Sequence, residues 1–192
     1  MKSVAKQDCA SKHPPLSDIK SLREHARNHI GKGAVTAGYA ADRESVIESL
    51  NEALATELVC VLRYKRHYFT ATGINAAPVA AEFLAHAGEE MAHADLLAKR
   101  IVQLHGKPDF SPHGLAGRSH AEYSEGDSLK DMIKENLIAE RIAIESYREL
   151  IAHLGGRDPT TSRMLEDILA TEEEHAEDLS SLLDGMQDYT SL

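Results

Sequence analysis

Apolar residues recur at alternating steps of three and four positions in four long stretches of this 192-residue chain. Such steps place the apolar side chains along one side of an α-helix, as in helices that pack against each other at shallow angles. The pattern predicts four long helices, which we place at about 42–70, 78–105, 128–154 and 159–184. The third and fourth are separated only by a short turn that contains Gly155.

The segment 106–126, between the second and third predicted helices, contains two prolines and four glycines. A helix of about 28 residues is roughly 42 Å long, at about 1.5 Å per residue. About 21 extended residues can reach roughly 65 Å, so this segment can run the whole length of a bundle. The sequence therefore predicts an all-α four-helix bundle in which two helical hairpins are joined by a long crossover.

A short amphipathic helix is predicted before the bundle, from residues 17–18 to about Ile30, where Gly31 and Gly33 end it. Residues 1–16 are polar and contain two adjacent prolines, so we expect them to form a flexible tail. The predicted organisation has three parts: a basic N-terminal tail, short helix and linker over 1–41, the bundle over 42–185, and a C-terminal tail over 186–192.

Charge is distributed unevenly between these parts. The net charge is −10, but residues 1–32 hold seven Lys and Arg against three Asp and Glu. The acidic remainder would attract cations, which argues against binding of nucleic acid by the bundle itself. The basic arm of residues 1–32 leaves DNA binding open. The chain has no apolar run long enough for a signal peptide or a membrane span, so we expect a soluble cytoplasmic protein with no membrane partner.

Each of the four predicted helices has a glutamate among its apolar seam positions, and in two of them a histidine follows three residues later. Residues three apart project from the same side of a helix. These six residues are Glu57, Glu90, His93, Glu140, Glu172 and His175. The two halves of the bundle repeat one another, because the stretch ATELVCVLRY around Glu57 aligns with IAERIAIESY around Glu140.

Four ionised carboxylates inside an apolar bundle would repel one another and lose their hydration. Two divalent cations would balance the four negative charges, and neutral imidazoles would complete the coordination. Carboxylate oxygens with one imidazole per metal suit iron, and also manganese, better than soft metals. The six residues are therefore candidate ligands of a pair of metal ions.

This constellation resembles the ferroxidase centre of the ferritin-like superfamily, most closely that of the bacterioferritins, with the stretch EEMAHAD as its most specific part. The resemblance covers residues 42–184 and implies a ferritin-like bundle with a di-iron site. It implies that Glu57 and His93 are terminal ligands of one iron and Glu140 and His175 of the other. Glu90 and Glu172 would bridge the two irons.

The resemblance also singles out Tyr64 and Met91. Tyr64 occupies the position of a redox-active tyrosine, although a core tyrosine with a satisfied hydroxyl is an equal interpretation. Met91 occupies the position of the haem b ligand, although an apolar contact at a dimer interface is the preferred interpretation. Cys60 is interpreted as a small buried hydrophobe, with a reactive thiol as the alternative. Six further histidines have no predicted partner: His67, His86, His105, His113, His120 and His153.

Two departures from the bacterioferritins affect the expected assembly. We expect no fifth helix of the kind that helps close a 24-subunit shell. The predicted N-terminal helix and basic tail resemble those of Dps proteins, which form twelve-subunit shells. We therefore expect a homo-oligomeric shell of twelve rather than 24 subunits.

The expected function is iron storage and detoxification with ferroxidase activity, using O₂ or H₂O₂. The alternatives are a Dps-like DNA-protecting protein, with the basic tail on DNA, and a small manganese or iron redox enzyme without storage.

Overall fold

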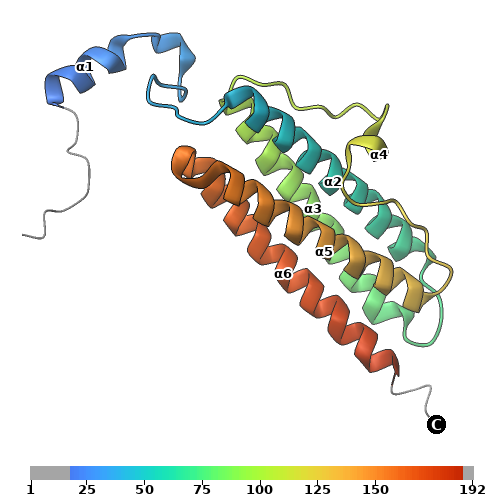
Figure 1. Cartoon of the computed structure of the whole chain (residues 1–192). Helices are drawn as coiled ribbons and strands as arrows, with labels where there is room; N and C mark the ends of the chain where they lie inside the picture. The colour runs from blue at the N-terminus through green and yellow to red at the C-terminus, as the bar shows by residue number, and fades with distance from the viewer. Residues whose placement is uncertain (1–17, 188–192) are drawn as a thin grey trace, which may run out of the picture. The chain divides into compact units, whose positions relative to one another are not determined.

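A computed structural model of the chain describes residues 18–187, and all of its regular structure over this range is helical (Figure 1). The elements in order are α1 (Ile19–Arg27), η1 (Ile30–Lys32), α2 (Arg43–Thr70), α3 (Ala76–Gln103), α4 (Leu115–Arg118), α5 (Leu129–Leu154), η2 (Gly155–Arg157) and α6 (Pro159–Gln187). The described residues fall into two compact units that divide between Ala37 and Gly38. The prediction of an all-helical bundle with an additional N-terminal helix is confirmed. No helix within 18–187 is both long and apolar enough to cross a membrane.

The first unit contains α1, which is shorter than predicted. The Asp18 carboxylate caps it by accepting from the backbone N–H groups of Lys20 and Ser21, and these bonds lower the pKa of Asp18. The predicted helix continued to Ile30, but α1 ends at Arg27. His29 has a φ of 54°, in the left-handed region, so the chain cannot continue the helix there and starts the separate 3₁₀ turn η1. The predicted tail over 1–16 lies outside the described residues.

The second unit is built from two hairpins, in which α2 packs along α3 and α5 packs along α6. The starts of three helices follow from capping residues. Asp42 accepts from the N–H groups of Glu44 and Ser45, Ser128 from that of Asp131, and Asp158 from that of Thr161; these residues precede or begin α2, α5 and α6.

Helix α3 begins at Ala76, two residues before the start predicted at Pro78. Pro78 is the third residue of the helix, where its missing N–H costs no hydrogen bond because the first-turn N–H groups have no partner within a helix. Helix α6 also continues three residues beyond the end predicted at about 184.

The predicted crossover joins the two hairpins and lies along α2, with the short helix α4 packed against it (Figure 1). At its start Gly106 approaches α2 so closely that a Cβ there would lie 2.7 Å from Ile47 Cγ2, which explains the glycine. Near its end the buried His67 ring on α2 lies 3.1 Å from the carbonyl oxygens of Ser124 and Glu125. The crossover is therefore held at both ends rather than loose over the bundle surface.

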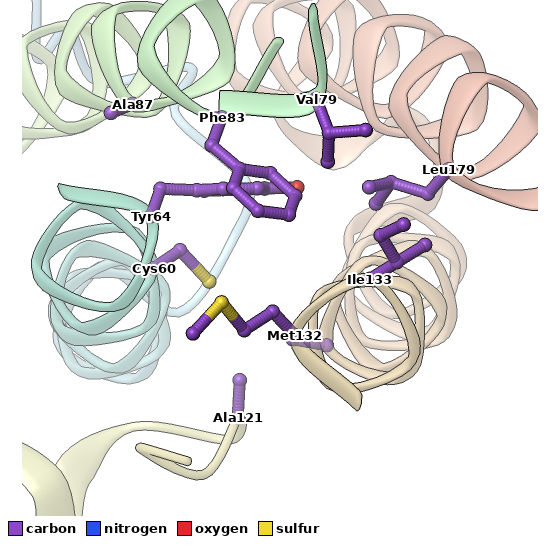
Figure 2. Packing of buried hydrophobic residues seen from close by; sticks show 10 residues of the cluster. Cys60, Tyr64, Val79, Phe83, Ala87, Ala121, Met132, Ile133 and Leu179 are labelled. Atoms are coloured by element: carbon purple, nitrogen blue, oxygen red, sulfur yellow. The ribbon is translucent and has the colours of Figure 1, made fainter. Parts of the chain in front are cut away.

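The core fills the space between the four long helices. Figure 2 shows one cluster, in which Tyr64 from α2, Phe83 from α3, Ile133 from α5 and Leu179 from α6 meet, with Ala121 from the crossover closing one side. Each large apolar side chain removed from water contributes about 1.5–3 kcal/mol to folding. This packing fixes the rotation of each helix about its axis and thereby decides which polar side chains point inward.

Candidate metal centre

All six predicted ligand residues converge inside the bundle, one or two from each long helix. Their exposed fractions range from 0 to 6%, so each is withdrawn from water. Helix α2 provides Glu57 and α5 provides Glu140, whereas α3 provides Glu90 and His93 and α6 provides Glu172 and His175.

One quartet surrounds the His93 ring. Its Nδ1 atom lies 2.9 Å from Glu172 Oε1, 3.4 Å from Glu90 Oε2 and 3.6 Å from Glu57 Oε2. One candidate ligand atom from each of these four residues lies within 4.8 Å of the other three. Metal–nitrogen and metal–oxygen bonds are about 2.0–2.2 Å long, so a single cation between these atoms could reach all four after small rotations.

A second quartet surrounds His175. Its Nδ1 atom lies 3.5 Å from Glu90 Oε1, 3.6 Å from Glu172 Oε2 and 3.9 Å from Glu140 Oε2. The two quartets share Glu90 and Glu172, and each of these carboxylates turns one oxygen toward His93 and the other toward His175. A carboxylate with one oxygen in each of two adjoining sites is in the position of a bridging ligand.

Seven buried atoms of this centre make no hydrogen bond and approach one another only at ion-pair distances. They are Glu90 Oε1 and Oε2, Glu172 Oε1 and Oε2, Glu140 Oε2, His93 Nδ1 and His175 Nδ1. Buried polar atoms are normally paired, because an unpaired one costs about 1–3 kcal/mol or more. These atoms belong to good ligands for a hard or borderline divalent cation, so the donor set fits a pair of iron ions.

Without a cation, the centre retains protons. Burial, reinforced by the Glu90 carboxylate, raises the pKa of Glu57 well above its usual range, and burial with the neighbouring Glu57 raises the pKa of Glu172 to about 8. Burial alone would lower the pKa of His93, but Glu172, Glu57 and Glu90 outweigh it and raise that pKa to about 12. The same balance raises the pKa of His175. Burial would raise the pKa of Glu140, but His175 and Glu172 outweigh it and lower that pKa to about 2, so this carboxylate is already ionised. An incoming cation would therefore replace protons on the other groups of the centre.

Two tyrosines support the terminal glutamates across the bundle. The Tyr64 hydroxyl on α2 donates to Glu140 on α5, and the Tyr147 hydroxyl on α5 donates to Glu57 on α2. Burial raises the pKa of both hydroxyls well above the usual range, so both keep their protons. Tyr64 thus lies beside the centre with a satisfied hydroxyl, and a redox role for it stays a prediction. The contact of Tyr147 was missed, although its sequence alignment with Tyr64 could have indicated it.

Two further residues that sequence reasoning missed lie behind His175. Its Nε2 atom donates to Glu89 Oε2 at 2.7 Å, and its ring stacks on that of His86 with 4.0 Å between centroids. A carboxylate on the outer nitrogen fixes the tautomer and direction of a ligating imidazole. Glu89 was overlooked because it adjoins Glu90 in sequence and its side chain is about half exposed.

Met91 and Cys60 do not line the centre. Met91 is 39% exposed on the surface of α3, and the expectation of haem at this position stays a prediction. Cys60 is buried and accepts a hydrogen bond from Arg63 Nη2 at 3.4 Å, and burial raises the pKa of its thiol. These features favour a small buried hydrophobe over a reactive thiolate.

Comparison with known proteins agrees with this architecture. The family described as "Ferritin-like domain" matches residues 47–188. The bacterioferritin of Brucella melitensis is 32% identical over 142 residues, which cover 72% of this chain and 83% of that protein. A "Nutrient stress-induced DNA-binding protein" of a Synechococcus species is 30% identical over 141 residues, covering 72% of this chain and 80% of that protein. Among solved structures, the bacterioferritin-related dodecameric thioferritin of Bacteroides fragilis has a TM-score of 0.76 and 33% identity, covering 79% of this chain and 91% of that one.

Proposed function

Because the chain belongs to the ferritin-like family, we propose that it oxidises Fe²⁺ at the six-residue centre and stores the Fe³⁺ product as a mineral inside a homo-oligomeric shell. The observation that carries this proposal is the set of seven unpaired ligand atoms in two overlapping quartets. Four carboxylates balance the charge of two Fe²⁺ ions, and this neutralisation lowers the energetic cost of burying the carboxylates and the cations.

Each residue of the centre then has a role that its position supports. Glu57 and His93 hold one Fe²⁺, while Glu140 and His175 hold the other. Glu90 and Glu172 bridge the pair, since each directs one oxygen into each quartet. The Tyr147 and Tyr64 hydroxyls orient the carboxylates of the two terminal glutamates, which keeps the cage in shape while cations enter and leave.

The reaction is a two-electron oxidation shared between two substrate ions. With peroxide, two Fe²⁺, one H₂O₂ and two protons yield two Fe³⁺ and two H₂O. With oxygen, two Fe²⁺, one O₂ and two protons yield two Fe³⁺ and one H₂O₂. Pairing the ions matters because a single Fe²⁺ would give peroxide one electron and release a hydroxyl radical. The protein contributes the positioning of both ions within reach of one oxidant.

Storage requires an enclosed assembly, and several observations support one. The Bacteroides fragilis neighbour is described as dodecameric. On the second unit, five large apolar side chains are at least half exposed, and contacts with other subunits would remove them from water. They are Leu62, Phe69, Ile74, Val102 and Ile138. The net charge of −10 would attract Fe²⁺ to the shell.

Removal of the bridging ligands tests the proposed function. Glu90→Ala and Glu172→Ala each take one oxygen from both sites, so we expect the fast phase of Fe²⁺ oxidation to slow by at least about tenfold in stopped-flow absorbance. Glu166→Ala, at an exposed glutamate on α6, is the matched control and should keep the wild-type rate. Wild-type rates in both bridging variants would refute the assignment of the centre.

A DNA-protecting role is a second candidate, favoured by the resemblance to the Synechococcus DNA-binding protein and by the basic arm. Lys and Arg neutralise phosphates and release counterions, so binding through the arm would weaken steeply with salt. A gel-shift titration with duplex DNA should show tighter binding by the full chain than by a variant lacking residues 1–16. Equal binding by the two proteins would exclude the tail as a DNA-binding element.

A further inference from the structure

A separate group of metal-ligating side chains lies beside the centre on α3 and α6. It consists of Glu82, His86 and Asp178, which we call the lateral cluster, and none of the three belongs to the six-residue centre. One candidate ligand atom from each lies within 4.8 Å of the other two. The His86 side chain is only 2% exposed, whereas those of Glu82 and Asp178 are 41% and 57% exposed. The cluster therefore has a buried imidazole at its base and two carboxylates at the surface.

The hydrogen bonds of Tyr64 determine the tautomer of His86, and so which ring nitrogen offers a lone pair to the side of the carboxylates. The Tyr64 hydroxyl donates its only hydrogen to Glu140, so its oxygen can only accept from His86 Nδ1, 3.2 Å away. In the neutral ring, Nε2 then carries no hydrogen. This atom lies 3.3 Å from Glu82 Oε1 and 3.9 Å from Asp178 Oδ2, which also offer only lone pairs. Three acceptor atoms within 4.8 Å of one another leave a place for a cation.

The internal repeat of the bundle does not explain the lateral cluster. Superposing Glu90 on Glu172 in sequence places Met164 opposite Glu82 and Ile168 opposite His86, and superposing His175 on His93 places Leu96 opposite Asp178. All three counterparts are apolar. The six-residue centre is thus nearly two-fold symmetric in its donors, whereas the polar cluster occurs on one side of it only.

The lateral cluster adjoins the centre through stacked imidazoles. The ring of His86 lies parallel to that of His175 within 21°, at 4.0 Å, and His175 directs Nδ1 into the second quartet. Glu89, which accepts from His175 Nε2, has a side chain that is about half exposed. Its carboxylate, His86 and His175 also place ligand atoms within 4.8 Å of one another. Candidate metal-ligand atoms therefore form a continuous series from the exposed carboxylates to the buried second quartet.

We propose that Glu82, His86 and Asp178 form a third cation site, which binds a divalent first-row metal ion and holds Fe²⁺ before it enters the centre on the His175 side. One imidazole and two carboxylates suit Fe²⁺, Mn²⁺, Co²⁺ and Zn²⁺, with water completing the coordination at the exposed side. Binding of a cation at this site stands independently, whereas its part in delivering iron depends on the proposed ferroxidase function.

Counting bound Co²⁺ tests the binding claim, because Co²⁺ fits the same donors and does not require an oxidant. We use the full-length protein in the double variant Glu82→Gln/Asp178→Asn, which changes only exposed or half-exposed side chains. The control is Asp95→Asn/Glu177→Gln, which removes the same charge from exposed positions on the same two helices. Equilibrium dialysis with metal analysis should show one Co²⁺ fewer per chain in the cluster variant than in the control. Equal Co²⁺ in the two variants would overturn the proposal and indicate that a protonated His86 simply pairs with the carboxylates.

Delivery is tested by Fe²⁺ oxidation at limiting iron. The cluster variant should oxidise substoichiometric Fe²⁺ about tenfold more slowly than the control, as expected for loss of groups around a metal site, and the two should converge at saturating Fe²⁺. If the cluster variant and the control had identical rates at limiting iron, and the cluster variant still bound one Co²⁺ fewer, the delivery role would be refuted and the cation site supported. If neither protein oxidised Fe²⁺ quickly, the proposed function would fail while the Co²⁺ count still decided the third site.

Discussion

At the scale of the residue, the centre depends on carboxylates that would be unfavourable anywhere else in an apolar core. Glu57 and Glu140 are each held by a tyrosine from the opposite half of the bundle, so neither carboxylate is free to rotate away from the metal positions. Glu90 and Glu172 have no such donor, and their four oxygens face only the two imidazoles. This difference agrees with the proposed roles. The terminal ligands Glu57 and Glu140 need a hydrogen bond to orient them, whereas two cations would orient the bridging ligands Glu90 and Glu172.

The tyrosine at the first quartet provides the prediction at this scale. Tyr147→Phe removes the donor to Glu57 and leaves its carboxylate free to turn, so the affinity for Co²⁺ at the centre should fall about tenfold. Tyr64→Phe should weaken the second quartet similarly and also release His86 Nδ1. Isothermal titration with Co²⁺ measures both effects, with Tyr123→Phe, at an exposed tyrosine of the crossover, as the control. Unchanged affinity in Tyr147→Phe would show that the hydroxyl contributes only to packing.

At the scale of the element, α6 is connected to α3 by one buried polar group at the end of the bundle. Asp158 accepts from the N–H and hydroxyl of Thr161, from Arg100 Nη2 at 2.9 Å and from the Tyr39 hydroxyl at 2.9 Å. Burial would raise the pKa of Asp158, but the bonds from Thr161 and Arg100 outweigh it and lower that pKa. One carboxylate thus starts α6 and neutralises a buried guanidinium on α3.

Replacing this carboxylate should destabilise the bundle in a pH-dependent way. Asp158→Asn can still cap α6 but leaves Arg100 without its counter-charge, so the free energy of unfolding at pH 7 should fall by about 3 kcal/mol. Because the folded-state pKa of Asp158 is lowered, its contribution is complete above the unfolded value of 3.8 and is lost as the pH falls through the lower folded value. Urea unfolding between pH 3 and 7 should therefore show the variant approaching the wild type only below about pH 4. Asp184→Asn, at an exposed position on α6, should have no effect; a constant difference across the whole range would contradict the ion-pair explanation.

The local patterns of the sequence predicted the helices and the six inward-pointing residues, and missed what depends on contacts between distant elements. Asp42 and Asp158 mark helix starts, and the ExxH spacing places Glu90 with His93 on one side of α3, all within a few residues. The bond from Tyr147 to Glu57 joins residues 90 positions apart, and the approach of His86 to Asp178 depends on how α3 and α6 are rotated. The short helix α4 was not predicted because its four residues, LAGR, have too little pattern to distinguish a helix from a loop.

At the scale of the whole molecule, the bundle has features of a subunit rather than of an isolated protein. It has a buried cluster of candidate metal ligands, a net negative charge, and large apolar side chains such as Phe69 and Ile74 that are mostly exposed. Burial of these side chains between neighbours would enclose a volume in which Fe³⁺ could mineralise. A protein that remained a monomer or dimer could carry out the oxidation but could not retain the product.

Mass measurement separates storage from a redox reaction without storage. Twelve chains of 21.0 kDa give a particle of about 250 kDa, which we expect by size exclusion with multi-angle light scattering. Phe69→Ser/Ile74→Ser should shift the mass toward smaller species if these side chains lie at subunit contacts, while Leu84→Ser, at a less exposed apolar position, is the comparison. A wild-type species of only one or two chains would exclude a mineral-storing shell.

The central claim is that carboxylates from all four long helices and two imidazoles hold a pair of cations. Anomalous diffraction from crystals soaked with Fe²⁺ without oxygen, recorded on both sides of the iron absorption edge, tests this most directly. We predict two peaks inside the bundle, one bonded to Glu57 and His93 and the other to Glu140 and His175, with Glu90 and Glu172 touching both. No peak there, or a single peak that neither bridging glutamate contacts, would contradict the account.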